Sequence, residues 1–247
     1  MSTSLVLLHG WGLSSAVWAG LRAQFDPGWS IHAPDLPGHG SAAPAGPTLA
    51  AWADALLPAI PDGAIVVGWS LGAMLALHLA ECAPQKVARL ALIGATPRFV
   101  QGQDWTDALP ADTLADFRRG FDLDPAATQR RFVALQSLGD ASRRDVSAAL
   151  TDALTPCDAG HLPALATGLV HLAETDQREL IRRIRQPVRL LHGSDDRLMP
   201  VAAAEWLADA LPHARLTVLK QCGHAPFLSR PVDCATLIES FAAERFP

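Results

Sequence analysis

The stretch AIVVGWSLG at residues 64–72 joins a short apolar run to a helical pattern through a G-x-S-x-G element. The run at 64–67 is apolar at consecutive positions, which is typical of a strand buried on both faces. A sharp turn from such a strand into a helix projects the serine hydroxyl from the carboxyl edge of the sheet, and the flanking glycines leave room for it. The helix behind adds N–H donors and a partial positive charge. A bare G-x-S-x-G could be a chance glycine-rich turn, but this context predicts that Ser70 is a nucleophile.

Apolar runs of the same kind recur along the chain and predict its fold. Six of them indicate buried strands: Leu5–Leu8, Ser30–Ala33, Ala64–Val67, Arg89–Ile93, Val188–His192 and Arg215–Leu219. Helical patterns lie between and after them, at Ser15–Phe25, Leu49–Leu57, Leu71–Cys82, Ala202–Leu211 and Val232–Arg245. This alternation implies an α/β protein with a doubly wound, mostly parallel sheet and right-handed crossovers.

One long segment, residues 97–186, interrupts the alternation. It shows helical periodicity and no convincing strand, with the apolar spacing of amphipathic helices at Phe117, Phe121, Phe132, Leu135 and Leu138. We interpret it as an all-helical lid over the mouth of the sheet. Residues 1–96 and 187–247 then form the core.

Composition restricts the class of protein and its partners. Of the 247 residues 49% are apolar and 18% are charged, as in a well-buried globular enzyme, and the net charge of -5 gives no reason to expect nucleic-acid binding. The N-terminus has no basic region, and its apolar stretch is too short for a secretion signal or a membrane span. The four cysteines are scattered, which favours free thiols in a reducing compartment. We therefore expect a cytoplasmic protein, and a monomer.

A serine nucleophile needs a base and a group that orients the base. Of nine histidines, His224 follows the last predicted strand, so its loop shares the sheet edge of Ser70. The orienting acid should also end a strand, and Asp195 and Asp196 both follow Val188–His192. Both satisfy the chain order Ser, Asp, His. Alternatively, an Asp pair at this place is turn chemistry or a helix cap.

The negative charge that develops during acyl transfer needs two N–H donors aimed at one oxygen. One should come from Leu71, the residue after the nucleophile. The other should come from the loop His9-Gly10-Trp11-Gly12 after the first strand, where glycines on both sides let the amide of Trp11 turn inward. His9 and His39 have structural explanations in their loops.

Taken together, these elements resemble the α/β-hydrolase superfamily over nearly the whole chain. In that superfamily the acid lies three residues after a glycine, in G-x-x-D followed by a proline. The pattern falls on Gly193, Asp196 and Pro200, which favours Asp196 over Asp195. The superfamily usually has two strands before the first motif, whereas this chain reaches Leu5–Leu8 at once. The resemblance therefore implies an α/β-hydrolase fold whose sheet has about six strands, with the N-terminal strands missing.

A narrower resemblance points to a substrate. The segments LLHGWGL (7–13), GWSLG (68–72), RFVALQ (131–136) and HAPF (224–227) closely resemble the pimeloyl-[acyl-carrier protein] methyl ester esterases of biotin synthesis. The resemblance implies a substrate bound to acyl-carrier protein and no metal or organic cofactor. It implies substrate contacts from Trp11, Ser70, Leu71 and His224, and from the lid residues Phe132, Val133, Ala134, Leu135 and Gln136. The alternative for the lid residues is that they only seal the lid onto the core.

The resemblance also implies that lid arginines meet an acidic carrier protein. Arg131 and Arg144 match the family's positions, whereas Ala127 and Ala148 stand where arginines are expected. The segment 97–186 holds eleven Arg but thirteen Asp and Glu, so these arginines could instead be solvated or paired on helix faces.

The same residues are compatible with other functions. A broad carboxylesterase, thioesterase or lactonase would use the same triad. A dehalogenase or epoxide hydrolase would need Asp in place of Ser70. A non-catalytic binding module would be expected to lose triad members, and none is missing.

Overall fold

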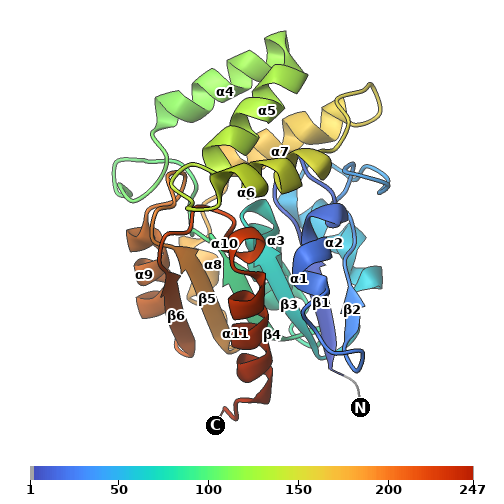
Figure 1. The fold of residues 1–247 in the computed structure, drawn as a ribbon, viewed down its shortest axis with the longest axis vertical. Helices are drawn as coiled ribbons and strands as arrows, with labels where there is room; N and C mark the ends of the chain where they lie inside the picture. The colour runs from blue at the N-terminus through green and yellow to red at the C-terminus, as the bar shows by residue number, and fades with distance from the viewer. Residues whose placement is uncertain (1–2, 247) are drawn as a thin grey trace.

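A six-stranded parallel sheet forms the centre of the computed structural model, which describes residues 3–246 (Figure 1). The strands, in sheet order, are β2 (Ser30–His32), β1 (Ser4–Leu8), β3 (Ala64–Trp69), β4 (Val87–Ile93), β5 (Val188–Gly193) and β6 (Ala214–Leu219). All neighbouring pairs are parallel. The predicted α/β class, the parallel sheet and its six strands are confirmed.

Burial explains which strands lie in the middle of the sheet. Every residue of β3 and β5 is buried, and β1 is buried after its first residue. The strands β1 and β3 read as continuous apolar runs because helices cover both of their faces. The edge strands β2 and β6 are mostly half-buried or exposed, so their sequences are less apolar.

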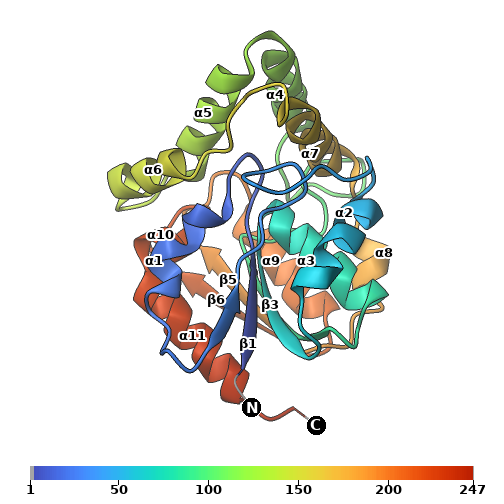
Figure 2. The same cartoon turned by 90° about the vertical axis from the view of Figure 1, so that its right-hand side faces the viewer.

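Helices cover the sheet on both faces (Figure 2). One face carries α2 (Leu49–Leu56), α3 (Leu71–Cys82), α8 (Arg178–Ile181) and α9 (Val201–Ala210), and the other carries α1 (Ala19–Arg22), α10 (Pro226–Ser229) and α11 (Pro231–Ala243). Two regions differ from the sequence prediction by more than a residue or two at the end of an element. The first predicted helix is a 3₁₀ turn at Ser15–Trp18 followed by α1, and the last is preceded by the short helix α10.

The helices α4 (Ala111–Leu123), α5 (Pro125–Gln136), α6 (Arg143–Asp152) and α7 (Leu162–Glu174) lie above the carboxyl edge of the sheet (Figures 1 and 2). We call these four helices and their connecting loops the lid. The helix α8 packs beside α3 instead, so the predicted segment 97–186 includes one helix of the core layer. Leu138 is exposed because α5 ends at Gln136, two residues before it.

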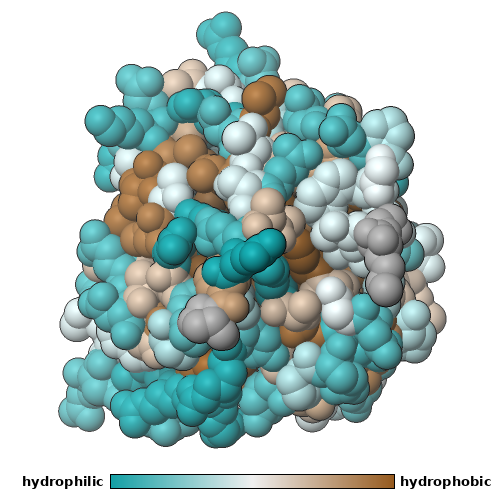
Figure 3. Space-filling view, turned by 90° about the horizontal axis from the view of Figure 1, so that it is seen from below, coloured by the Kyte–Doolittle hydropathy of each residue, from teal (hydrophilic) through white to brown (hydrophobic). Residues whose placement is uncertain are grey.

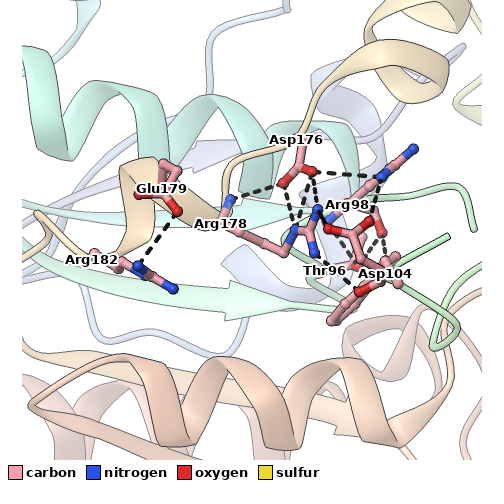
Figure 4. Close-up of polar contacts among 8 residues, drawn as sticks. Thr96, Arg98, Asp104, Asp176, Arg178, Glu179 and Arg182 are labelled. Carbon is pink, nitrogen blue, oxygen red and sulfur yellow. Dashed lines mark hydrogen bonds and ion pairs between the residues drawn. The ribbon is translucent and has the colours of Figure 1, made fainter. Parts of the chain in front are cut away.

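An ion-pair network joins the two stems of the lid (Figure 4). Arg178 donates to Asp176, and one of its nitrogens lies 2.9 Å from an oxygen of Asp104. Arg98 lies 3.6 Å from Asp104 and 3.7 Å from Asp176. The hydrogen bonds from Arg178 hold the pKa of Asp176 below its usual value although burial opposes them. The network therefore ties the segment that enters the lid to the segment that leaves it.

The end of the molecule opposite the lid is mostly hydrophilic, with apolar side chains in separate groups (Figure 3). Within residues 3–246, none of the helices combines the length and the hydrophobicity that a bilayer crossing requires.

Candidate active site

Ser70 occupies the turn between β3 and α3 and has a strained backbone, with φ 56° and ψ -117°. A non-glycine residue with positive φ costs of order 1–3 kcal/mol, which the surrounding structure must supply. The turn is tight because α3 begins immediately, and a Cβ atom at Gly72 would collide with the carbonyl oxygen of Leu8. The backbone N–H of Ser70 donates to Ile93 at the end of β4, 3.1 Å away.

His224 lies at the same edge of the sheet. Its carbonyl oxygen accepts from the indole N–H of Trp69, the residue before Ser70, at 2.9 Å. Its ring faces Gly94, the residue after β4, closely enough that a Cβ atom there would be 2.9 Å from Cε1. The Oγ of Ser70 and the Nε2 of His224 are both buried and have no hydrogen-bond partner within residues 3–246. These are the two atoms between which a proton must pass if Ser70 is to act as a nucleophile.

Asp196 fixes the orientation of His224. Its Oδ2 lies 2.7 Å from Nδ1 of His224, and its Oδ1 accepts from the N–H groups of Leu198 and Met199 at 2.9 Å each. Burial alone would raise the pKa of Asp196, but the charge of His224 and these hydrogen bonds outweigh it, so the pKa lies below its usual value. The neighbouring Asp195 is half-buried and accepts from the hydroxyl of Ser194 instead.

His192 is a further buried histidine of this site, which the sequence analysis treated as an ordinary strand residue. Its Nε2 lies 3.5 Å from Oδ2 of Asp196 and 2.9 Å from the carbonyl oxygen of Met199. Since a carbonyl can only accept, Nε2 carries the proton. Burial lowers the pKa of His192, so the neutral ring lies beside Asp196 and donates its Nε2 proton to the carbonyl oxygen of Met199. Its position four residues before Asp196, on the strand that carries the acid, could have indicated this contact.

Two backbone N–H groups next to Ser70 are free to stabilise an anion. Neither Trp11 nor Leu71 donates its N–H to any group that the structure describes in residues 3–246. The loop after β1 lies against the nucleophile, because a Cβ atom at Gly10 would be 3.5 Å from Cβ of Ser70. These are the two amides that the sequence analysis proposed for an oxyanion hole.

His9 holds the peptide that contains the Trp11 N–H. Its Nε2 accepts from the N–H of Leu36 at 2.9 Å, so its Nδ1 carries the proton and donates to Gly10 O at 2.8 Å. Burial lowers the pKa of His9 to about 4, which keeps the ring neutral near pH 7. In a trans peptide the C=O and N–H point in opposite directions, so the bond to Gly10 O turns the Trp11 N–H away from His9.

The lid residues predicted to contact substrate, 132–136, lie on different faces of α5. The ring of Phe132 lies 5.1 Å from that of Trp11, and Gln136 is buried with its carbonyl oxygen accepting from the N–H of His224. Val133 is buried in the other hydrophobic cluster, on the side of α1 and α11. Leu135 is half-buried and Ala134 is exposed. The structure thus brings Phe132 and Gln136 to the site and leaves Ala134 at the surface.

The predicted docking arginines lie on the outer surface of the lid. Arg131 is exposed on α5, with its guanidinium carbon 4.9 Å from the centre of the Phe117 ring, and Arg144 is exposed on α6. Within residues 3–246, neither has a carboxylate within ion-pair distance, and the same holds for Arg130 and Arg143. In the described part of the chain, no group of three His, Cys, Asp or Glu side chains has the arrangement of a metal site.

Residues 3–231 match a family described as "alpha/beta hydrolase fold". An esterase from Exiguobacterium antarcticum superposes with a TM-score of 0.84 at 20% identity, covering 98% of this chain and 92% of the other. An esterase from a Rhodococcus species gives a TM-score of 0.78 at 25% identity, covering 98% and 91%.

Curated relatives are more similar in sequence. A pimeloyl-[acyl-carrier protein] methyl ester esterase from Aromatoleum aromaticum is 55% identical over 95% of this chain and 96% of its own length. Proteins of the same name from Chromobacterium violaceum and Nitrosomonas europaea are 42% and 36% identical, over 93% and 92% of this chain and 90% of each relative.

Proposed function

Since the chain belongs to the α/β-hydrolase fold family and, within it, to the pimeloyl-[acyl-carrier protein] methyl ester esterases, we propose that it hydrolyses the methyl ester of pimeloyl-[acyl-carrier protein]. The products are methanol and pimeloyl-[acyl-carrier protein], and the reaction serves biotin synthesis. The observation that carries the chemistry is the buried hydrogen bond of 2.7 Å between His224 and Asp196, next to a strained and unpartnered Ser70.

The mechanism is acyl transfer in two steps. Asp196 accepts a hydrogen bond from Nδ1–H of His224, so Nε2 carries the lone pair and takes the proton of Ser70 as Oγ attacks the ester carbonyl. The amides of Trp11 and Leu71 bind the oxyanion, and His224 then gives its proton to the leaving methoxide. Water attacks the acyl-enzyme by the same route in reverse and restores Ser70. An oxyanion donor in such a site stabilises the transition state by about 2.7–4 kcal/mol.

Apolar side chains between the core and the lid support binding of an acyl chain. Trp11, Leu71, Phe121, Phe132 and Leu169 belong to one buried cluster. The ring of Trp11 lies 5.9 Å from that of Phe121, and Phe121 lines a cavity of about 100 Å³ between α4 and α7. We place the pimeloyl chain along these side chains, with its ester at Ser70. Ser70 is only 6% exposed, so the lid must move for the substrate to enter.

The surface of α5 and α6 supports docking of the carrier protein. Arg130, Arg131, Arg143 and Arg144 are exposed, and these helices contact one another. Unpaired arginines on adjacent helices form a positive surface that suits an acidic partner. We also propose that the enzyme is a cytoplasmic monomer; the absence of disulfides among its four cysteines is consistent with a reducing compartment.

Turnover of two substrates by the purified enzyme tests the proposal. Pimeloyl-[acyl-carrier protein] methyl ester should lose its methyl group at a higher kcat/KM than p-nitrophenyl butyrate, as followed by mass spectrometry of the carrier protein. Ser70→Ala should abolish both reactions while the protein remains folded. Rapid cleavage of the short ester with no cleavage of the carrier-bound ester would identify a broad esterase instead, and full activity of Ser70→Ala would exclude the serine mechanism.

A further inference from the structure

The loop that carries the Trp11 amide is bound from the lid as well as from the core. The carbonyl oxygen of Gly12 accepts two hydrogen bonds, from the side-chain Nε2 of Gln129 at 2.7 Å and from the backbone N–H of Thr155 at 2.9 Å. Thr155 also donates its hydroxyl to the carbonyl of Leu13, and the indole N–H of Trp11 donates to Leu165. In Figure 2 this loop rises from β1 toward the lid helices.

Gln129 makes three side-chain hydrogen bonds in this contact. It projects from α5, is 4% exposed, and donates to the carbonyl oxygens of both Gly12 and Thr155. Its Oε1 accepts from the thiol of Cys157 at 3.1 Å. Because both partners of Nε2 are carbonyls, which can only accept, the amide has one possible orientation. Gln129 therefore bridges the loop after β1 and the segment that precedes α7.

The Trp11 N–H lies between two carbonyls that are held from opposite sides. His9, in the core, holds Gly10 O, and Gln129, in the lid, holds Gly12 O. Each peptide unit is planar, so fixing a carbonyl fixes the plane that it belongs to. Two of the three peptide planes between Gly10 and Leu13 are thus set by buried side chains. A shift of the lid would release one of them.

We propose that Gln129 is a positioning residue for the oxyanion hole, so that the loop carrying the Trp11 amide is held on both sides only while the lid is seated on the core. The inference rests on the proposed function, because it takes the Trp11 amide to be an oxyanion donor. It adds to that function a dependence of catalysis on the lid. Opening the lid to admit substrate loosens the donor, and closing the lid restores it.

Gln129→Met tests this role, with Gln177→Met as the matched control. Gln177 is also a buried glutamine, 2% exposed, and joins the lid stem to α3 through a hydrogen bond of 2.8 Å to the carbonyl of Met74. Both variants lose lid–core hydrogen bonds, but only Gln129→Met touches the oxyanion loop. Complete loss of an oxyanion donor costs about 10²–10³ in kcat. Because Thr155 still holds Gly12 O, we expect a loss of roughly tenfold in kcat, with KM within twofold.

A second readout separates positioning from stability. An alkylboronic acid forms a tetrahedral adduct on Ser70 with one boron-bound oxygen in the oxyanion hole. Its inhibition constant should rise in Gln129→Met by the same factor as kcat falls, and should not change in Gln177→Met. If Gln129→Met keeps kcat and boronate affinity within twofold of the wild type while Ser70→Ala is inactive, Gln129 only joins the lid to the core and the inference is wrong. Activity in Ser70→Ala would instead contradict the proposed function.

Gln129→Glu provides a second test of the proposal if the Met variant does not fold. When the introduced carboxyl group is protonated, its O–H can donate to Gly12 O, whereas the carboxylate cannot donate to either carbonyl. Burial raises the pKa of such a carboxyl toward neutrality. The ratio of the variant's kcat to that of the wild type should therefore fall as the pH rises from 6 to 8. A ratio that does not depend on pH would overturn the proposal.

Discussion

His224 and Asp196 share a hydrogen bond of 2.7 Å, and both side chains are completely buried. A carboxylate only accepts, so the bond determines which ring nitrogen of His224 carries its proton. It leaves Nε2 as the base. The interaction with His224 also helps to keep Asp196 ionised, because it lowers the carboxyl pKa against the effect of burial, together with the N–H group of Met199. The tautomer of His224 thus depends on this contact, and the charge of Asp196 depends on it in part.

Asp196→Asn should abolish most of the activity without unfolding the protein. The amide keeps the shape of the side chain, but if its N–H₂ group faces His224 it donates to Nδ1 and forces the proton onto Nε2. The corresponding change in other Ser-His-Asp enzymes lowers kcat by about 10⁴. Steady-state kinetics with p-nitrophenyl butyrate measure the loss.

Asp195→Asn is the control for this prediction, because Asp195 is the adjacent residue and bonds to Ser194 outside the triad. It should keep kcat within about twofold of the wild type. Equal losses in the two variants would show that Asp196 does not orient the base.

Buried histidines should make the fold less stable as the pH falls from 7 to 5. Burial lowers the pKa of His9 to about 4 and that of His39 to about 3. In the unfolded chain these two histidines bind a proton near pH 6.5, whereas in the folded protein they stay neutral to a lower pH. Their contribution to the free energy of unfolding is therefore complete above pH 6.5 and is lost as the pH falls toward the folded pKa values. His39→Gln removes one such group. Lowering the pH from 7 to 5 reduces the free energy of unfolding of both proteins. The reduction should be roughly 2 kcal/mol smaller in His39→Gln than in the wild type.

Urea unfolding at the two pH values measures this difference, and His213→Gln provides the control. His213 is exposed, so removing it should leave the pH dependence of the wild type unchanged. If His39→Gln shows the same pH dependence as the wild type, His39 does not carry the effect.

The fold could be predicted from local patterns because its central strands are buried on both faces. The residues of β3 read as an uninterrupted apolar run, and the turn at Ser70 places a helix directly after it. The strand β5 is also buried throughout, although it contains Arg189 and His192. The all-helical segment 97–186 was predicted from the absence of such runs. The break in the first helix and the end of α5 before Leu138 depend on packing against other elements, which local periodicity does not record.

Only part of the site could be predicted from the sequence. Residue type and strand ends alone left Asp195 and Asp196 equivalent, and only the superfamily spacing favoured Asp196, the aspartate that the structure places against His224. The sequence signal for His192 is its place four residues before Asp196, which does not by itself distinguish a neighbour of the acid from an ordinary strand residue. The bond from Gln129 to Gly12 spans 117 positions, so it exists only once the lid has folded onto the core.

Reversing charge on the lid should weaken the reaction with the carrier-bound ester and leave small esters unaffected. The variant Arg131→Glu/Arg144→Glu changes two exposed side chains that have no carboxylate partner in residues 3–246. Surface charges steer encounter with an oppositely charged partner, and like charges oppose it. We expect KM for pimeloyl-[acyl-carrier protein] methyl ester to rise roughly tenfold at low salt. The effect should be smaller at about 0.5 M salt, because screening shortens the Debye length to well under about 10 Å.

Arg185→Glu is the control for the docking surface, since Arg185 is exposed and follows α8 in the chain, and α8 lies away from α5 and α6 (Figure 2). It should leave KM for the carrier-bound ester within twofold of the wild type. A rise of the same size in Arg185→Glu would indicate a general effect of net charge, and an increase for p-nitrophenyl butyrate would indicate damage to the site.

Gly94→Ala should displace His224 and lower activity beyond what backbone strain explains. Gly94 has φ 53°, and a Cβ atom there would lie 2.9 Å from Cε1 and 3.1 Å from the carbonyl oxygen of His224. Gly63 has φ 72° with nothing within 4 Å of an added Cβ atom, so Gly63→Ala carries the strain without the clash. Backbone strain should cost each variant about 1–2 kcal/mol of stability. Only Gly94→Ala should lose kcat, by at least tenfold, because misplacing a catalytic group by 1 Å can cost about 10² in rate. Kinetics measured well below both melting temperatures separate the two effects, and equal kcat values would mean that Gly94 does not determine where His224 lies.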